Sequence, residues 1–298
     1  MAKIKPPIKK PKHPIKKTAP KSNPKQIRSL VDTSDRVAIV LPSSKWVFFQ
    51  NSALSSVPVM DDGHTIAPGY EKYVNDNNNT WINQHLKQYY KTYFGAHVFK
   101  NHEQVERQSY GFIADVVLRR VKDENNYRYV VDVLMAINIE SSPDKQLIKK
   151  IMETGEFKTS MGCNANSLMC SMCGNMSDDH NDECPHVMFN AHKEYYTNYG
   201  HKSIIAEIAC PHDSNGEIPQ YNKDDLDSYP ITFVENSILD GEDPAYKGVF
   251  TSYMIDMTNM IVDNNIVIPM PKVALNRSEF GAIKYWQKKG DLKIKEIK

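Results

Sequence analysis

The sequence lacks the features of several protein classes. No apolar run approaches the roughly 18 uninterrupted residues that a membrane-spanning helix needs. The N-terminus has no apolar stretch followed by a small-residue cleavage site, so no secretory signal is expected. The first thirty residues contain no acidic side chain at all. The first two absences argue against a transmembrane or secreted protein, and we expect no membrane partner.

The lack of acidic residues in the first thirty positions is not evident from the formal net charge of the whole chain, which is +1. Residues 1–30 carry nine Lys and one Arg, about +10, whereas the rest of the chain carries about −9. The same segment holds six prolines and few large apolar residues, so it cannot bury enough surface to offset its ordering entropy. We predict a disordered basic arm over residues 1–34, which can contact DNA or acidic proteins without sequence specificity.

The rest of the chain mixes strand and helix patterns. In residues 127–139 every second residue is apolar, which is typical of a strand, and residues 110–119 supply a partner for a β-hairpin. Ser142 as N-cap and Pro143 as first helical residue predict a helix that ends at Gly155. The same reasoning predicts a helix at about 80–93 and strands at 37–41, 46–49, 157–161, 203–209 and 231–239.

Cysteine is scarce and clustered, with five residues in the chain. Cys170 and Cys173 form a CxxC pair, and Cys184 and His186 follow ten residues later. Three thiolates and one imidazole make a tetrahedral donor set that suits a structural Zn²⁺ ion. An odd number of cysteines without a secretory signal also favours metal binding in a reducing compartment over disulfides.

Two questions about the cysteines stay open in the sequence. His180 competes with His186 as the fourth ligand, and we prefer His186 because it lies beside Cys184 as in a zinc knuckle. Cys163 and Cys210 stand outside the cluster, and we expect them to be small core residues.

Three further segments carry residues capable of catalysis near the ends of predicted strands. They are Asn101-His102, Ser160-Met161-Gly162 and Glu235-Asn236-Ser237. Spacing alone does not turn them into a catalytic triad, because a single serine or histidine more often has a structural role.

Their order, however, resembles that of the prohead maturation proteases of tailed phages, whose fold is related to the herpesvirus capsid-assembly protease. His102 precedes a hairpin that begins near Gly111, and a helix ending in Gly155 leads into Ser160-Met161-Gly162. The run from Cys170 to His186 is similar to an insert that some phage members carry just after the serine. Glu235-Asn236-Ser237 and Asp243-Pro244-Ala245 resemble the family's later strand and turn. The resemblance covers about residues 90–250.

The resemblance implies an α+β fold with a mainly antiparallel, β-barrel-like core and flanking helices, as in herpesvirus proteases, together with a small zinc-knuckle insertion. The expected organisation is a basic arm (1–34), a protease-like domain (35–250) with a zinc insert at about 163–190, and a C-terminal extension (251–298).

It also implies a serine endopeptidase in which Ser160 is the nucleophile, His102 the general base and Glu235 the acid that orients His102. His97 is the alternative base, and Asp115 and Asp132 are the alternative acids. The expected substrates are phage scaffold and major capsid proteins and the chain itself, with cleavage within residues 1–34. The expected location is the host cytoplasm, inside the prohead or virion.

Two other functions remain compatible with the sequence. The chain can be a non-catalytic virion or scaffold component of the same fold, or a zinc-ribbon nucleic-acid-binding protein that uses the basic arm. The acidic body and the lack of aromatic residues interleaved in the arm argue against the latter.

Overall fold

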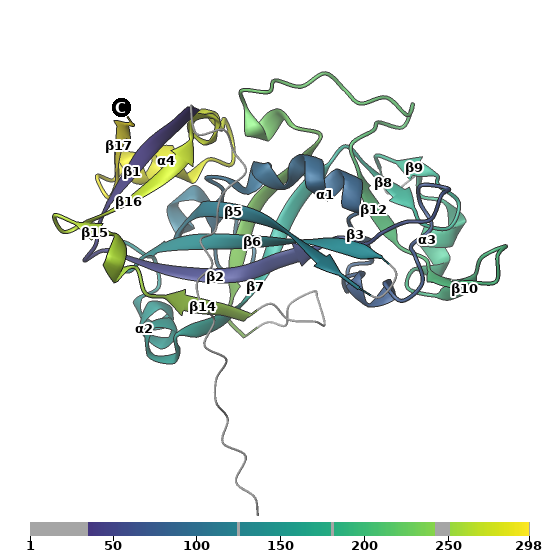
Figure 1. Ribbon diagram of the computed structural model, residues 1–298, viewed down its shortest axis with the longest axis horizontal. Coiled ribbons are helices and arrows are strands. Elements are labelled where there is room, and N and C mark those ends of the chain that lie inside the picture. Colours follow the sequence, from purple (N-terminus) through teal and green to yellow (C-terminus); the bar gives the residue numbers. More distant parts are fainter. Residues whose placement is uncertain (1–34, 124–125, 180–181, 242–250, 298) are drawn as a thin grey trace, which may run out of the picture.

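A closed barrel of seven strands forms the centre of the computed structural model, which describes residues 35–123, 126–179, 182–241 and 251–297 (Figure 1). Neighbouring strands pair antiparallel except β13 and β4, which pair in parallel. This confirms an α+β fold with a barrel core. In barrel order the strands are β13 (Ile231–Leu239), β4 (His97–Val98), β5 (Gly111–Lys122), β6 (Tyr127–Asn138), β2 (Trp46–Ser55), β14 (Thr251–Ile255) and β7 (Glu156–Ala165).

The predicted hairpin is the β5–β6 pair, and its first glycine has a steric reason. A Cβ atom on Gly111 would lie 1.8 Å from the carbonyl oxygen of Ala136 on β6, so only glycine lets the two backbones approach. Alternate residues of β6 fill the barrel, among them Val131, Val133 and Met135. The period of two therefore identified both the strand and its buried face.

A second sheet and a helix cover one end of the barrel, on the left of Figure 1. The sheet order is β15 (Ile261–Val262), β16 (Asn265–Pro271), β1 (Arg36–Pro42) and β17 (Lys293–Glu296), and the helix is α4 (Ala282–Lys288). Trp286 of α4 packs edge-on against Trp46 of β2, with ring centroids 5.2 Å apart. Tight aromatic packing of this kind joins the C-terminal residues to the barrel.

The expected boundary at residue 250 is therefore wrong as a fold boundary. Strand β14 pairs with β2 and β7 and closes the barrel, and β16 and β17 flank β1. Sequence patterns could not place this boundary, because the strands after residue 250 pair with strands of the predicted protease-like domain, most of them more than two hundred residues away. Short strands carry no local signal of such long-range pairing.

A buried ion pair joins the C-terminal segment to η6 (Leu226–Ser228), the turn that precedes β13. Arg277 and Asp227 are 2.6 Å apart, with side chains 0% and 2% exposed. The same guanidinium donates to the backbone carbonyl oxygens of Thr92, Phe94 and Phe233, at 2.8, 3.2 and 3.1 Å. Burying a guanidinium is costly unless it is paired and hydrogen-bonded, and this one satisfies both conditions.

The helices lie close to their predicted positions, with one corrected cap. Helix α1 (Asn83–Tyr89) continues into η3 (Tyr90–Tyr93), which covers the helix expected at about 80–93. Helix α2 (Lys145–Thr154) ends at Gly155, whose φ of 70° is the left-handed cap predicted from the sequence. Its N-cap, however, is Asp144, whose carboxylate accepts hydrogen bonds from the backbone N–H groups of Gln146 and Leu147.

Ser142, the predicted N-cap, instead donates its hydroxyl to the carbonyl oxygen of Asn138. The remaining 3₁₀ turns are η2 (Glu71–Tyr73), η4 (Glu106–Gln108), η6 (Leu226–Ser228), η7 (Thr258–Met260) and η8 (Lys272–Asn276). Within the described ranges, no helix is long and apolar enough to cross a membrane.

The opposite end of the molecule, on the right of Figure 1, contains residues 167–179 and 182–212, which we call the Cys-rich lobe. A small sheet has the order β3 (Asn79–Thr80), β12 (Glu207–Cys210), β8 (Ser167–Cys170) and β9 (Met176–Ser177), and beside it lie α3 (Pro185–Asn190) and the hairpin β10 (Glu194–Tyr196)–β11 (Lys202–Ile204). The single strand predicted at 203–209 is thus two strands in different sheets.

Three predicted features lie outside the described residues. They are the basic arm (1–34), the alternative zinc ligand His180, and the Asp243-Pro244-Ala245 turn.

Candidate active site and metal cluster

A histidine–carboxylate pair lies on the outer face of the barrel. His102 follows β4, and its Nδ1 is hydrogen-bonded to Oε1 of Glu235 on β13. The Glu235 side chain is fully buried, whereas that of His102 is 39% exposed. A buried carboxylate that holds one ring nitrogen of a partly exposed imidazole is the arrangement that orients a catalytic base.

Ser237 completes a closed hydrogen-bond network around this pair. Its hydroxyl donates to Oε2 of Glu235 and accepts from the backbone N–H of His102 at 3.2 Å. Both carboxylate oxygens of Glu235 are therefore occupied. The sequence pattern included Ser237 but gave it no role, although a serine two residues from an acid on a strand lies on the same face and can reach it.

The backbone before His102 is held in a sparsely populated conformation. Asn101 and His102 have φ angles of 47° and 60°, both in the left-handed region that non-glycine residues rarely adopt. Asn101 is fixed to the end of β13 because its backbone N–H donates to Ile238 and its side-chain amide both accepts from and donates to the backbone of Asp240. Strain of this kind persists where surrounding contacts determine it, and it is concentrated at functional sites.

Ser160 is brought to the site by strand register. On the antiparallel pair β7–β13, Ser160 lies opposite Ser237 and Gly162 lies opposite Glu235. Directly opposite residues place their Cβ atoms about 5 Å apart on the same face. Ser160 is half-buried, in line with the exposed Lys158 and on the face opposite the buried Thr159. The structure thus joins His102 and Glu235 by direct contact and brings Ser160 beside them by register.

Gly162 has a specific role in this geometry. A Cβ atom at this position would lie 2.7 Å from Oε1 and 2.8 Å from Cγ of Glu235. Any side chain here would push the carboxylate away from His102. The glycine two residues after Ser160 is therefore what lets Glu235 lie flat against β7.

The alternative base and acids have other partners. His97 is buried, its Nδ1 is 2.8 Å from the hydroxyl of Ser109, and burial lowers its pKa to about 3. Asp132 pairs with Arg119 at 2.7 Å. Asp115 accepts from the backbone N–H of Val116, and burial raises its pKa. These contacts favour structural roles for all three residues.

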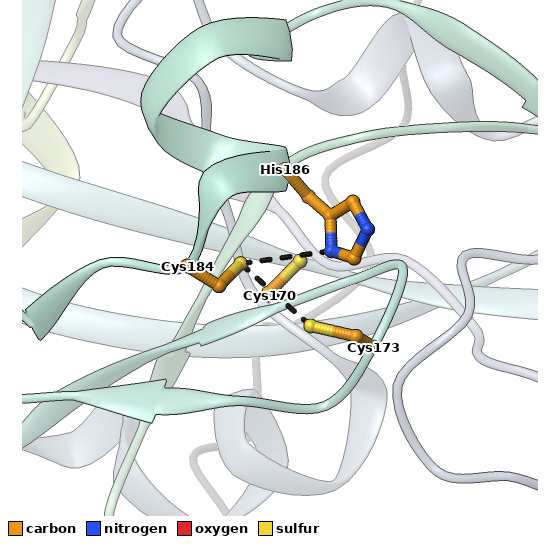
Figure 2. Close-up of side chains that lie close together, drawn as sticks. All are labelled: Cys170, Cys173, Cys184 and His186. Atoms are coloured by element: carbon orange, nitrogen blue, oxygen red, sulfur yellow. Dashed lines mark hydrogen bonds between the residues drawn. The ribbon is translucent and has the colours of Figure 1, made fainter.

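The four predicted metal ligands do come together (Figure 2). Their ligand atoms all lie within 4.8 Å of one another, with Cys173 Sγ 3.6 Å and His186 Nδ1 3.8 Å from Cys184 Sγ. In a tetrahedral zinc site with bonds of 2.0–2.3 Å, neighbouring ligand atoms are about 3.3–3.8 Å apart. The cluster (Cys170, Cys173, Cys184, His186) can therefore hold a metal ion.

Local backbone geometry explains how the cluster forms. Cys170 ends β8, and a tight turn brings Cys173 back beside it, since the N–H of Gly174 donates to the Cys170 carbonyl at 2.9 Å. Gly174 has a φ of 71°, and a Cβ atom there would lie 3.0 Å from the ring of His64. Cys184 caps α3, which starts with Pro185, and this places His186 in the first helical turn.

The protonation of the thiols also suits a cation. Burial raises the pKa of the Cys170 thiol to about 12. The pKa of Cys184 is lowered even though burial opposes the change, because the backbone N–H of Val187 and the thiols of Cys170 and Cys173 stabilise its thiolate. A divalent ion would favour the thiolate form of all three cysteines.

The two other cysteines lie in different surroundings. Cys163 is on β7 and half-buried. Cys210 is 1% exposed, as expected for a core residue, but its Sγ lies 3.2 Å from Nδ1 of His212, a neighbour that the sequence analysis did not consider.

A cavity of about 620 Å³ lies between the candidate nucleophile strand and the Cys-rich lobe. One side is formed by the end of β7, including Cys163 and Asn164, and another by Asp178, Asp179 and Glu183 of the lobe. A hollow of this size beside Ser160's own strand has room for several side chains of a bound peptide.

Comparison with known proteins adds no assignment. No protein-family model, curated protein or solved structure matches this chain. Function must therefore be argued from the geometry of the site.

Proposed function

We propose that this chain is a serine endopeptidase with the triad Ser160, His102 and Glu235. The observation that carries the proposal is the His102–Glu235 hydrogen bond on the strand face that Ser160 shares. A buried acid, an oriented imidazole and a hydroxyl on one face are the parts that serine-protease chemistry requires.

In the proposed reaction Ser160 Oγ attacks the peptide carbonyl carbon while His102 Nε2 accepts its proton. The C–N bond then breaks as His102 returns that proton to the leaving amine, and water releases the acyl group by the same steps in reverse. Glu235 stabilises the imidazolium through Nδ1. Ser237 holds the second oxygen of Glu235 and the backbone of His102, so it is a positioning residue.

We further propose that the Cys-rich cluster binds a structural Zn²⁺ ion. Four protein ligands leave no open coordination position, so the ion would have a structural role. It would stabilise the lobe, whose residues form one wall of the cavity beside β7. On this hypothesis the substrates are scaffold and capsid proteins of a phage head and the chain's own arm. Support for that substrate class is the ordered resemblance of the motifs from His102 to Glu235.

An active-site label tests the chemistry without a known substrate. Purified chain is treated with a fluorophosphonate, which reacts with activated serines, and the modified residue is located by mass spectrometry. We expect labelling at Ser160 that falls at least about 10³-fold in His102→Ala, the scale of a lost triad member. Ser214→Ala, which removes an exposed serine, is the matched control and should label normally.

Substrate class is tested by co-expressing the wild-type chain or Ser160→Ala with capsid and scaffold proteins. Products present only with the wild type support the proposal, and N-terminal fragments of the chain itself would show self-cleavage. Absence of labelling at Ser160 in folded protein would reject the triad and favour a non-catalytic head component.

A further inference from the structure

A second group of metal-ligating side chains lies at the other end of the lobe sheet. His85 on α1, Cys210 at the end of β12 and His212 just after it have ligand atoms that all lie within 4.8 Å of one another. We call these three residues the His–Cys–His cluster. None of these residues belongs to the cluster in Figure 2. The two clusters lie at opposite ends of the β8–β12 pair, where Glu207 lies opposite Cys170 at one end and Cys210 lies opposite Ser167 at the other.

The spacing within this group fits coordination. Cys210 Sγ and His212 Nδ1 are 3.2 Å apart. Sulfur and nitrogen ligands of one tetrahedral zinc ion are separated by about 3.5 Å. The residue spacing C-x-H is the same as that of Cys184 and His186 in the first cluster, so one short sequence pattern occurs at both ends of the sheet.

The orientation of His85 is the independent observation. Its Nδ1 lies 2.9 Å from the carbonyl oxygen of Ala209. A carbonyl can only accept, so Nδ1 carries the proton and Nε2 presents its lone pair on the other edge of the ring. Metal-bound histidines are typically fixed in this way, with the second nitrogen donating to a backbone carbonyl.

The burial of His85 and Cys210 distinguishes the His–Cys–His cluster from a chance grouping of surface side chains. His85 is 5% and Cys210 1% exposed, and the Met176 thioether lies 3.8 Å from the Cys210 sulfur. A buried cysteine in a purely structural role needs no imidazole partner, and here two imidazoles converge on it. Two nitrogens and one thiolate form a donor set for Zn²⁺ or copper, and cellular availability favours zinc.

We propose that His85, Cys210 and His212 bind a second Zn²⁺ ion. The fourth position is open to water or to the sulfur of Met176. This ion would join α1, which packs against the barrel, to the central strand of the lobe sheet. The lobe would then be anchored by one metal ion within itself and by another at its junction with the barrel. The proposal does not depend on protease activity.

Metal stoichiometry tests it on the folded full-length chain. After dialysis against Zn²⁺ and removal of excess, we expect two equivalents of zinc in the wild type. His212→Ala should lose one of the two. Cys163→Ser, a half-buried cysteine of the same chain, is the matched control and should keep both. A wild type that holds no zinc, or a His212→Ala variant that keeps as much zinc as the wild type, would overturn the proposal.

X-ray absorption at the zinc edge tests the same site without any mutation, which guards against a variant that fails to fold. With both sites filled, the sulfur ligands average about two per zinc ion if water takes the fourth position of the second site, and about 2.5 if Met176 takes it. An average of three would mean that only the Cys170 cluster is occupied and would also reject the second site.

Discussion

The barrel and the Cys-rich lobe are stabilised in different ways. The barrel and the C-terminal sheet share one large cluster of buried apolar side chains, in which Trp46 contacts both Phe112 and Trp286. The lobe has one small cluster of its own, which consists of Cys170, Cys184 and two aliphatic residues, and it shares a second small cluster with residues 57–82. Its strands are two to four residues long, whereas the barrel strands β5 and β6 each have 12.

The difference indicates where bound metal ions would contribute most to stability. A unit of fewer than about 50 residues rarely buries enough apolar surface to be stable by itself, and a structural metal commonly makes up the deficit. The candidate active site belongs to the barrel, but β7 leads from Ser160 directly into the lobe. On the proposed function, the barrel would set the catalytic geometry and the lobe would affect substrate access.

Chelation should produce the largest effect, and only in the lobe. Structural zinc contributes on the order of 10 kcal/mol in small zinc domains at neutral pH. We expect a strong chelator to abolish hydrogen-exchange protection in β8, β9 and β12 while β5 and β6 stay protected. Exchange followed by mass spectrometry measures both regions in one sample.

Cys173→Ser should mimic the chelator, and Cys163→Ser should not, because only Cys173 belongs to the cluster. Equal loss of protection in the barrel strands would contradict the separation of the two regions. Unchanged protection in the lobe would show that its apolar clusters are sufficient.

Arg277→Met should be the most damaging single change on the barrel side. It leaves Asp227 buried without its cation and removes three donors to backbone carbonyls. Breaking one partner of a buried pair costs about 3–5 kcal/mol of unfolding free energy. Urea unfolding followed by tryptophan fluorescence measures the loss.

The matched control is Arg119→Met, because Arg119 also pairs with an aspartate but is half exposed. Surface pairs contribute about 0–1 kcal/mol, so this variant should be close to wild type. Similar losses in both variants would show that burial does not set the difference. Zinc content should be unchanged in Arg277→Met if the protein remains folded.

Acid should weaken the barrel through His97. Burial lowers the pKa of His97 to about 3, whereas an unfolded histidine titrates near 6.5. Unfolding therefore takes up a proton at this site between these two pH values. The stabilisation is complete above pH 6.5 and is lost as the pH falls toward 3, by at most about 1.4 kcal/mol per pH unit.

Between pH 7 and pH 5 this one group should account for about 2 kcal/mol of lost unfolding free energy. His97→Gln should show a correspondingly smaller pH dependence. His201→Gln, at an exposed position, should keep the wild-type slope. An unchanged slope in His97→Gln would mean that His97 is not the group that titrates on unfolding.

Local patterns predicted a large part of this structure. The period of two in residues 127–139 identified β6 and its buried face, and Gly155 marked the end of α2. The CxxC pair and the Cys-x-His pair identified the four residues of the first cluster, because short-range spacing in a turn and at a helix start fixes their distances. The pairing of His102 with Glu235 was expected only from the order of motifs, and these residues lie 133 positions apart.

The features that could not be predicted from the sequence depend on the register of strands that are far apart in the chain. Met176, His85 and Cys210 meet only after β8, β9 and β12 have paired and α1 has docked beside them. The role of Gly162 likewise appears only when β13 is laid opposite β7. Residues 251–298 carried no motif, and their strands became recognisable through partners elsewhere in the chain.

The smallest effect we predict is local to α2, which lies beside β7 on the barrel. Asp144→Ala removes the N-cap and should cost about 1 kcal/mol of unfolding free energy. Asp144 also pairs with Lys100 at 3.3 Å, so Asp144→Asn is the informative comparison, since asparagine can still cap but carries no charge. We expect Asp144→Asn to be near wild type in urea unfolding. If both variants lost the same free energy of unfolding, the ion pair with Lys100 rather than the N-cap would be responsible. The N-cap contact of Asp144, which replaces the one predicted for Ser142, would then not contribute to stability.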